Sequence, residues 1–467
     1  MIRLISAGTL CLVAGATLFA ASSAPQIPLS ALSSPLKEVA FAVPEDAEVT
    51  ATLRASCSGC DWGVVGRESA VLRLAVDGRY SQNLFLVRGA TASDYHVLLG
   101  PLPKGPHQLT LSLDKKASSK RLGEVAVTDV TFQFFGASHP DHSAIALAPV
   151  LHARPNTLGR FSDVPLLLWY EKEKTTRGSR IRYSAVFSNE DGGTPADRLL
   201  ATWGRLTDLE YVYGIEFDHE GRVIEETFQG KDHEIVPFRG KREGFHPVLF
   251  VITDNNMVKD EGTPTPRFAP APILFDLTHA SRELVMDEHP WTYAVTAQEA
   301  RREGRVSKAP APGSKKIFDP RRYAVLEACA APEDTAFATF SFSLGVKDAS
   351  GKTKYFDSTA GVKEYRISRS PDNFPNGCFR GAVALPTGTA AGDVNALRVR
   401  AYPRPPRKGE VLKAAPGPAR LLRVNRLFLM NRYDQPEPSL FSWTGEAALP
   451  LDGEPVTIET RPSISKR

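Results

Sequence analysis

Short runs of alternating apolar and polar residues, separated by glycine- and proline-containing turns, recur along most of this chain. Residues 71–76 alternate before the Asp77-Gly78 dipeptide, and Leu84 and Leu86 resume the alternation after it. Asp-Gly between two alternating runs is a strong signal of a β-hairpin. Strands of this length and spacing are typical of antiparallel β-sandwiches. The sequence therefore predicts a mainly β protein.

The length of 467 residues is too great for one hydrophobic core, so we expect several β-sandwich-like modules in tandem. A Pro-, Ala- and Lys-rich stretch has the composition of a linker. One short helix is expected before the last module, at residues 292–305. The predicted divisions are a signal peptide at 1–24, an N-terminal β-sandwich at 38–137, a central β-rich domain at 138–304, a linker at 305–316 and a C-terminal β-rich domain at 317–460.

The first 24 residues have the layout of a secretory signal peptide. Arg3 provides a basic start, residues 4–20 form an apolar run, and small residues follow at 20–24. Cleavage is expected near residues 22–24, which would make the mature protein secreted or periplasmic. No second apolar stretch is long enough to cross a bilayer. The formal net charge of +4 is small and spread along the chain, which argues against a nucleic-acid partner.

Four cysteines follow the predicted signal peptide, and an even number in an oxidising compartment favours disulfides. Three pairings are open, and the economical one joins Cys57 to Cys60 and Cys329 to Cys378. A thiol-redox motif at Cys57 and Cys60 is the alternative. Such a motif needs a helix N-terminus to lower the thiol pKa, and residues 61–66 do not begin a helix.

The best candidate site is an acidic strand around residues 203–213. Alternation places Asp208 and Glu210 on one face, opposite Leu209, Tyr211 and Tyr213. Two carboxylates on one face could share a hard cation such as Ca²⁺ or Mg²⁺, or act as acid and base. The alternative is the solvated outer face of a half-buried strand.

Gly204, Asp208 and Glu210 form a Gly-x-x-x-Asp-x-Glu pattern that resembles the GHRHDWE motif of necrosis- and ethylene-inducing-like proteins. A related vacuolar-sorting-associated β-sandwich family is similar. The likeness covers roughly a quarter of the chain and includes Lys231-Asp232-His233 downstream. It implies a β-sandwich whose acidic residues help to bind a divalent cation near a surface that binds sphingolipid sugars. The sequence departs from the motif at the two histidines and the tryptophan, which are Arg205, Thr207 and Leu209 here.

His233 is the third candidate metal ligand, with a surface histidine as the alternative. Asp191 and Asp254 could face the same end of the sheet as the acidic strand. The stretch His139-Pro140-Asp141-His142 could also hold a transition metal, although polar loop residues are expected at such a junction. Trp291 and Trp443 could stack on sugars, but buried aromatic residues are commoner than binding platforms.

The sequence favours an exported, noncatalytic binding or envelope-associated protein whose partner is a glycan or a cell-surface molecule. The rival hypothesis is a divalent-metal-dependent enzyme or a lipid-active protein centred on Asp208 and Glu210. No nucleophile elbow or phosphate-binding loop supports other chemistry. An acidic strand that converges with His233 in a concave site would favour the rival hypothesis.

Overall fold

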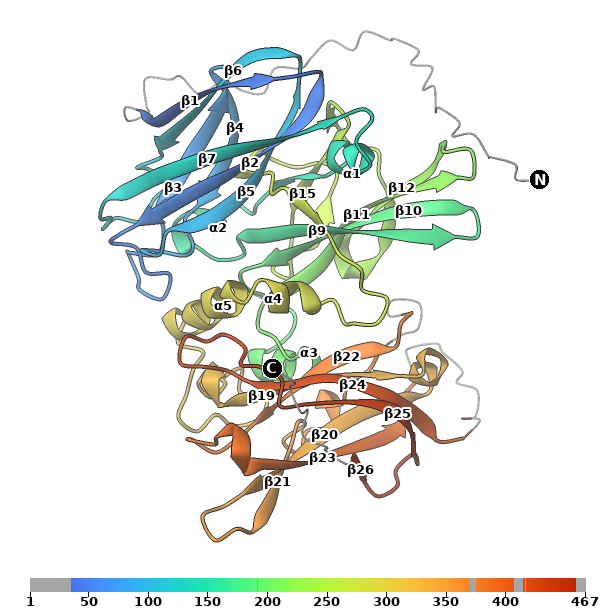
Figure 1. Ribbon diagram of the computed structural model, residues 1–467. Helices are drawn as coiled ribbons and strands as arrows, with labels where there is room; N and C mark the ends of the chain where they lie inside the picture. The colour runs from blue at the N-terminus through green and yellow to red at the C-terminus, as the bar shows by residue number, and fades with distance from the viewer. Residues whose placement is uncertain (1–34, 191, 370–374, 407–414, 416, 459–467) are drawn as a thin grey trace, which may run out of the picture.

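The computed structural model describes residues 35–190, 192–369, 375–406, 415 and 417–458, so the predicted signal peptide lies outside the described residues. Within that part, the chain is mainly β, and its strands form six sheets that are largely antiparallel. Figure 1 shows the sheets paired into three β-sandwiches that follow one another along the chain. The predicted fold class is confirmed.

The N-terminal sandwich packs a four-stranded sheet on a three-stranded sheet. The two sheets have the orders β1 (Pro35–Val43), β6 (Gly105–Leu113), β3 (Val71–Val76), β4 (Arg79–Phe85) and β5 (Ser93–Leu102), β2 (Ala47–Cys57), β7 (Val125–Gly136). The hairpin between β3 and β4 turns at Asp77 and Gly78, whose φ angles of 50° and 74° are both positive. A two-residue turn that matches the strand twist requires this conformation, which explains the Asp-Gly signal.

The central domain also consists of two packed sheets. The larger has the order β13 (Ile235–Pro237), β12 (Val223–Gln229), β11 (Asp208–Asp218), β10 (Gly178–Phe187), β9 (Pro165–Thr175), β18 (Pro272–Leu274). The smaller has the order β14 (Arg242–Glu243), β15 (His246–Val251), β8 (Val150–His152), β17 (Arg267–Phe268), with β16 (Val258–Lys259) also on β15. Apolar residues of both sheets form one core between them, so one face of the larger sheet is turned away from this core.

The C-terminal sandwich repeats the two-sheet arrangement with its own core. Its sheets have the orders β22 (Cys378–Ala384), β19 (Tyr323–Ala330), β24 (Ala419–Leu429), β25 (Phe441–Leu449) and β21 (Thr353–Asp357), β20 (Ala338–Lys347), β23 (Val394–Pro403), β26 (Val456–Ile458). Cys329 and Cys378 lie directly opposite each other on β19 and β22 and form a disulfide. Cys57, the last residue of β2, is bonded to Cys60. Both predicted disulfides are confirmed.

The expected helix before the last module is α5 (Trp291–Arg302), but the described residues hold other short helices. These are α1 (His142–Ala146), α2 (Thr157–Arg160), α3 (Ala196–Trp203) and α4 (Leu284–Glu288). Helix α3 ends at Gly204, which adopts the left-handed conformation with φ 64°. Trp203, expected on the acidic strand, is therefore the last residue of a helix. None of the described helices is long and apolar enough to cross a bilayer.

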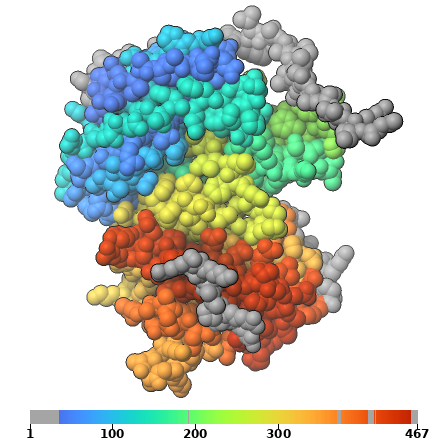
Figure 2. Space-filling view, in the orientation of Figure 1, coloured from blue at the N-terminus to red at the C-terminus, as the bar shows by residue number. Residues whose placement is uncertain are grey.

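The central domain and the C-terminal sandwich meet at α3, α4 and α5, as Figure 1 shows. In Figure 2 the yellow atoms of the central part of the chain lie directly against the red atoms of the C-terminal part. An apolar cluster joins these helices to β19, β22 and β24. Beside it, the fully buried Arg380 donates hydrogen bonds to Glu327 at 2.7 Å, and to Asp287 and Tyr293 at 2.9 Å. Whether the 305–316 segment separates independently folding units stays a prediction, which limited proteolysis tests.

Candidate functional site

A polar cleft of about 790 Å³ lies over the face of the larger central sheet that is turned away from the core. Its floor is formed by residues of β10, β11 and β12, and one wall by residues of α3. Ser368 and Arg369 of the C-terminal sandwich complete the rim. Both the central domain and the C-terminal sandwich therefore contribute residues to the cleft.

The acidic strand predicted from the sequence begins β11 and lies on the cleft floor. Asp208 and Glu210 both line the cleft, while Leu209 and Tyr213 belong to apolar clusters. Only 2% of Asp208 and 9% of Glu210 is exposed, so the solvated-face alternative is wrong.

The alternation along the acidic strand is interrupted after Glu210. Tyr183 pairs with Tyr213 and Ser184 with Tyr211, which leaves Val212 as an extra residue on β11. An extra residue of this kind is a β-bulge, and it changes which side chains share a face. Tyr211 consequently lines the cleft, where its hydroxyl lies 2.7 Å from the hydroxyl of Thr227. The prediction that Tyr211 lies opposite the carboxylates is wrong.

Amide side chains donate hydrogen bonds to both carboxyl groups. Nδ2 of Asn256 donates to Oδ2 of Asp208 at 3.0 Å, and Nε2 of Gln229 donates to Glu210. The same Gln229 nitrogen lies 3.2 Å from Nδ1 of His233. The structure thus brings the three predicted metal ligands into one network, with an amide between Glu210 and His233.

The amide N–H groups already contact one oxygen of each carboxyl group, which leaves fewer oxygen ligands open to a divalent cation. Among the described residues, no group of three or more His, Cys, Asp or Glu side chains could hold a metal ion. Asp254 pairs with Arg154 instead, and Asp191 lies outside the described residues. The hypothesis of Ca²⁺ or Mg²⁺ on Asp208, Glu210 and His233 stays a prediction.

Burial shifts Asp208, Glu210 and Glu190 in the cleft towards their neutral forms. Burial and the adjacent Glu210 carboxyl raise the pKa of Asp208, and burial also raises the pKa of Glu210. Burial and the charge of Asp208 raise the pKa of Glu190 to about 8. Oε1 of Glu190 accepts the backbone N–H of Thr194 at 2.7 Å. The pKa of about 8 favours a protonated Glu190 at neutral pH, and burial favours the neutral form of Asp208 and Glu210 in the same direction. A protonated carboxyl group donates as well as accepts hydrogen bonds.

Arginine side chains in three different environments line the same cleft. Arg205 is buried and donates to Glu283 at 3.1 Å. Arg369 lies 4.9 Å above the Trp203 ring, and burial lowers its pKa to about 9. The exposed guanidinium of Arg198 has no ion pair within the described residues. The cleft thus presents cationic, acidic, amide and aromatic groups together.

The other sequence candidates have local roles. The backbone N–H of Asp141 donates to Nδ1 of His139, and the Asp141 carboxylate accepts from Lys172 at 2.9 Å. Nδ1 of His142 lies 2.8 Å from the carbonyl oxygen of Phe135. Trp443 packs against the C-terminal core.

Sequence reasoning missed Glu190, Gln229 and Arg369 as members of the cleft. No signal along the chain marks them, because loops, another strand and another domain bring them to β11.

No family model matches this chain, and no curated protein matches its sequence. Parts of the fold are similar to solved structures at low TM-scores. A sugar-binding protein, the C-terminal domain of EclA, is 12% identical at TM-score 0.17, over 21% of this chain and 66% of that one. The CBM36-1 domain of a multidomain xylanase from the hindgut metagenome of Trinervitermes trinervoides is 16% identical at TM-score 0.17. This likeness covers 23% of this chain and 77% of that one. A family two carbohydrate esterase from Clostridium thermocellum is 18% identical at TM-score 0.14. This likeness covers 26% of this chain and 30% of that one.

Likenesses at these TM-scores carry no argument about this protein. The resemblance to necrosis- and ethylene-inducing-like proteins stays a hypothesis. The candidate site therefore depends on the geometry of the cleft.

Proposed function

We propose that this protein is an exported, noncatalytic binding protein that holds a glycan in the polar cleft of its central domain. The observation that carries the proposal is the composition of the cleft wall. The rings of Trp203 and Tyr211 line the same space as the carboxyl groups of Asp208 and Glu210 and the amide of Gln229.

A sugar ring needs this mixture of groups. Its hydroxyls both donate and accept hydrogen bonds, so they pair with carboxyl, amide and guanidinium groups. Its C–H faces are apolar and can lie against aromatic rings, which have a large apolar body. Trp203 and Tyr211 are half-buried, with part of each side chain accessible from the cleft.

Export is proposed from the signal-like residues 1–24 together with the two disulfides, which are typical of secreted and periplasmic proteins. The partner would then be a glycan in solution or on a cell surface.

A glycan array followed by isothermal titration calorimetry tests the binding proposal. We expect the purified protein to retain a defined class of oligosaccharide, and the Trp203→Ala variant to bind it about tenfold more weakly. Tyr433→Ala is the matched control, because Tyr433 is 60% exposed on the C-terminal sandwich and outside the cleft. Equal affinities of the two variants would contradict the proposal, and so would an array without any retained glycan.

The convergence of Asp208, Glu210 and His233 in the cleft, together with the raised pKa of both carboxyl groups, favours a second candidate, an enzyme that uses general acid catalysis on a bound glycan. A buried acid whose pKa is raised towards neutrality can protonate a leaving oxygen while water attacks the sugar carbon. Incubation of the retained oligosaccharide with the protein, followed by assay of new reducing ends, tests this candidate. Product that disappears in Asp208→Asn supports an enzyme, and an intact oligosaccharide supports a noncatalytic protein. The same assay with and without Ca²⁺ tests the metal-dependent alternative.

A further inference from the structure

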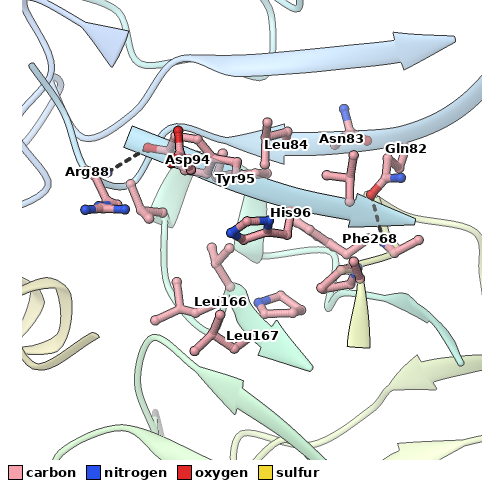
Figure 3. Close-up of a pocket in the computed structure, with 18 of the residues that line it drawn as sticks. Gln82, Asn83, Leu84, Arg88, Asp94, Tyr95, His96, Leu166, Leu167 and Phe268 are labelled. Atoms are coloured by element: carbon pink, nitrogen blue, oxygen red, sulfur yellow. Dashed lines mark hydrogen bonds between the residues drawn. The ribbon is translucent and has the colours of Figure 1, made fainter. Parts of the chain in front are cut away.

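A second pocket, of about 240 Å³, lies where the N-terminal sandwich meets the central domain. Figure 3 shows Arg88 and His96 on one side and Leu166 and Leu167 on the other. Beside the pocket, a hydrogen bond joins the two domains: the backbone N–H of Ala269 donates to Oε1 of Gln82 at 3.0 Å. The pocket is separate from the cleft, with no lining residue in common.

The walls of the pocket are mainly apolar. The apolar side chains come from both domains and include Leu84, Phe85, Val97, Leu166, Leu167 and Phe268. The volume is below the roughly 300–1,000 Å³ of pockets for drug-sized ligands. An occupant would therefore be a small molecule with an apolar body.

Three basic side chains line this apolar space. The guanidinium of Arg88 lies 5.4 Å from the centre of the Trp291 ring and has no ion pair or side-chain hydrogen bond within the described part of the chain. Nδ1 of His96 lies 2.9 Å from the hydroxyl of Thr52, and Nδ1 of His289 lies 2.9 Å from the carbonyl of Val285.

The second ring nitrogen of both His96 and His289, Nε2, has no hydrogen-bond partner among the described residues. Each Nε2 can accept a hydrogen bond when the imidazole is neutral and donate one when it is protonated.

The guanidinium of Arg88 has no direct carboxylate partner among the residues that line the pocket, although the charge of Asp94 acts on it from a distance. Asp94 is the one acidic residue among those that line it, and it pairs with Arg54 at 3.0 Å. Arg88 therefore keeps its N–H donors unused beside an apolar space. A guanidinium in that position is suited to a carboxylate, whose two oxygens match its paired N–H groups.

We propose that this interdomain pocket binds a small carboxylic acid with an apolar body, whose carboxylate pairs with Arg88 and whose remainder lies against Leu166, Leu167 and Phe268. The imidazoles of His96 and His289 supply further hydrogen bonds to the carboxylate or to a neighbouring hydroxyl. This site is independent of the proposed glycan cleft.

Benzoate and its neutral analogue benzamide are the probes for a calorimetric or ligand-observed NMR titration. We expect saturable binding of benzoate in the millimolar range or tighter, and binding of benzamide about tenfold weaker, because the charge-assisted bond to Arg88 is lost. The Arg88→Met variant should lose about tenfold in benzoate affinity. Arg79→Met is the matched control, since Arg79 is exposed at the start of β4 and does not line the pocket.

A measurement on the unaltered protein covers the case in which Arg88→Met does not fold. Benzoate should shift the imidazole Hε1 NMR signals of His96 and His289, and it should leave that of the exposed His219 in place. Equal binding of benzoate and benzamide would overturn the proposal, as would histidine signals that do not respond at saturating benzoate. Benzoate that binds Arg88→Met as well as it binds the unaltered protein would also overturn it.

Discussion

Two buried groups of charged residues lie close to the junction of the central domain and the C-terminal sandwich, and they differ in how their charges are paired. At the junction, Arg380 contacts Asp287 and Glu327, and Arg426 also contacts Asp287. In the cleft, Asp208 has only a 3.9 Å approach to Arg205 and otherwise accepts from an amide.

The pKa shifts follow this difference. Burial alone would lower the pKa of Arg380, but the carboxylates of Asp287 and Glu327 raise it above its usual value. Burial raises the pKa of Asp208 and Glu190 and lowers that of Arg369 to about 9. The junction therefore stabilises its charges, whereas burial disfavours the charges of Asp208, Glu190 and Arg369 in the cleft. Glu216, which also lines the cleft, differs from them because hydrogen bonds from Arg177 and Arg180 lower its pKa to about 2. Charged groups that the fold itself does not stabilise are a common property of binding and catalytic sites.

The largest expected effect comes from the junction. Arg380→Met should lower the free energy of unfolding by about 3–5 kcal/mol, because Asp287 and Glu327 would remain buried without their partner. Urea denaturation followed by circular dichroism measures the change. Lys347→Met, at an exposed position on β20, should stay within about 0.5 kcal/mol. A loss for Arg380→Met no larger than that of this control would contradict the account of the junction.

The cleft should make stability depend on pH in a direction set by Glu190. Its pKa is about 8 in the folded protein and near the ordinary 4.5 in the unfolded chain. Between these values the folded state binds more protons, so the free energy of unfolding falls as pH rises, by up to about 1.4 kcal/mol per pH unit. Unfolding measured across this range should show a shallower fall for Glu190→Gln. Glu446→Gln, at an exposed position, should keep the slope of the unaltered protein, and the same slope in Glu190→Gln would contradict the assignment.

Matched amide substitutions compare the two regions directly. Glu327→Gln removes a charge that Arg380 requires, whereas Asp208→Asn replaces a group whose pKa burial and Glu210 already raise. At neutral pH we expect Asp208→Asn to change the free energy of unfolding by less than about 1 kcal/mol, and Glu327→Gln to cost several times more. Equal losses in chemical denaturation would remove the distinction between the two regions.

The smallest expected effect is that of divalent cations. Because amide groups of Asn256 and Gln229 occupy oxygens of Asp208 and Glu210, we expect Ca²⁺, Mg²⁺ and chelator to leave the melting temperature unchanged. A cation that binds only the folded protein would stabilise it by about 2.7 kcal/mol at a hundredfold excess over its Kd. A cation-dependent increase in the free energy of unfolding of about that size would support the metal hypothesis, provided that the Asp208→Asn, Glu210→Gln double variant abolished it.

Local patterns were sufficient to predict much of the fold. The Asp77-Gly78 turn, the alternating strands around it and both disulfides are present as expected. Alternation also placed Asp208 and Glu210 on one face. These features depend on residues that are close in sequence or on cysteines with few pairing options. They can therefore be recognised in the sequence without knowledge of tertiary contacts.

The remainder of the cleft depends on contacts that local patterns do not encode. The bulge at Val212 adds one residue to β11 and moves Tyr211 to the cleft face, although nothing in the alternation marks it. Helix α3 has only eight residues, too short for a clear helical period. Arg369 comes from another domain, so its approach to Trp203 follows only from domain packing.

The central claim is that the polar cleft holds a glycan, and a crystal structure of the protein with an oligosaccharide retained on the array tests it most directly. The account predicts a sugar ring against Trp203 or Tyr211 with hydroxyls hydrogen-bonded to Asp208, Glu210 or Gln229. A sugar bound on another surface, with the cleft unchanged, would contradict it.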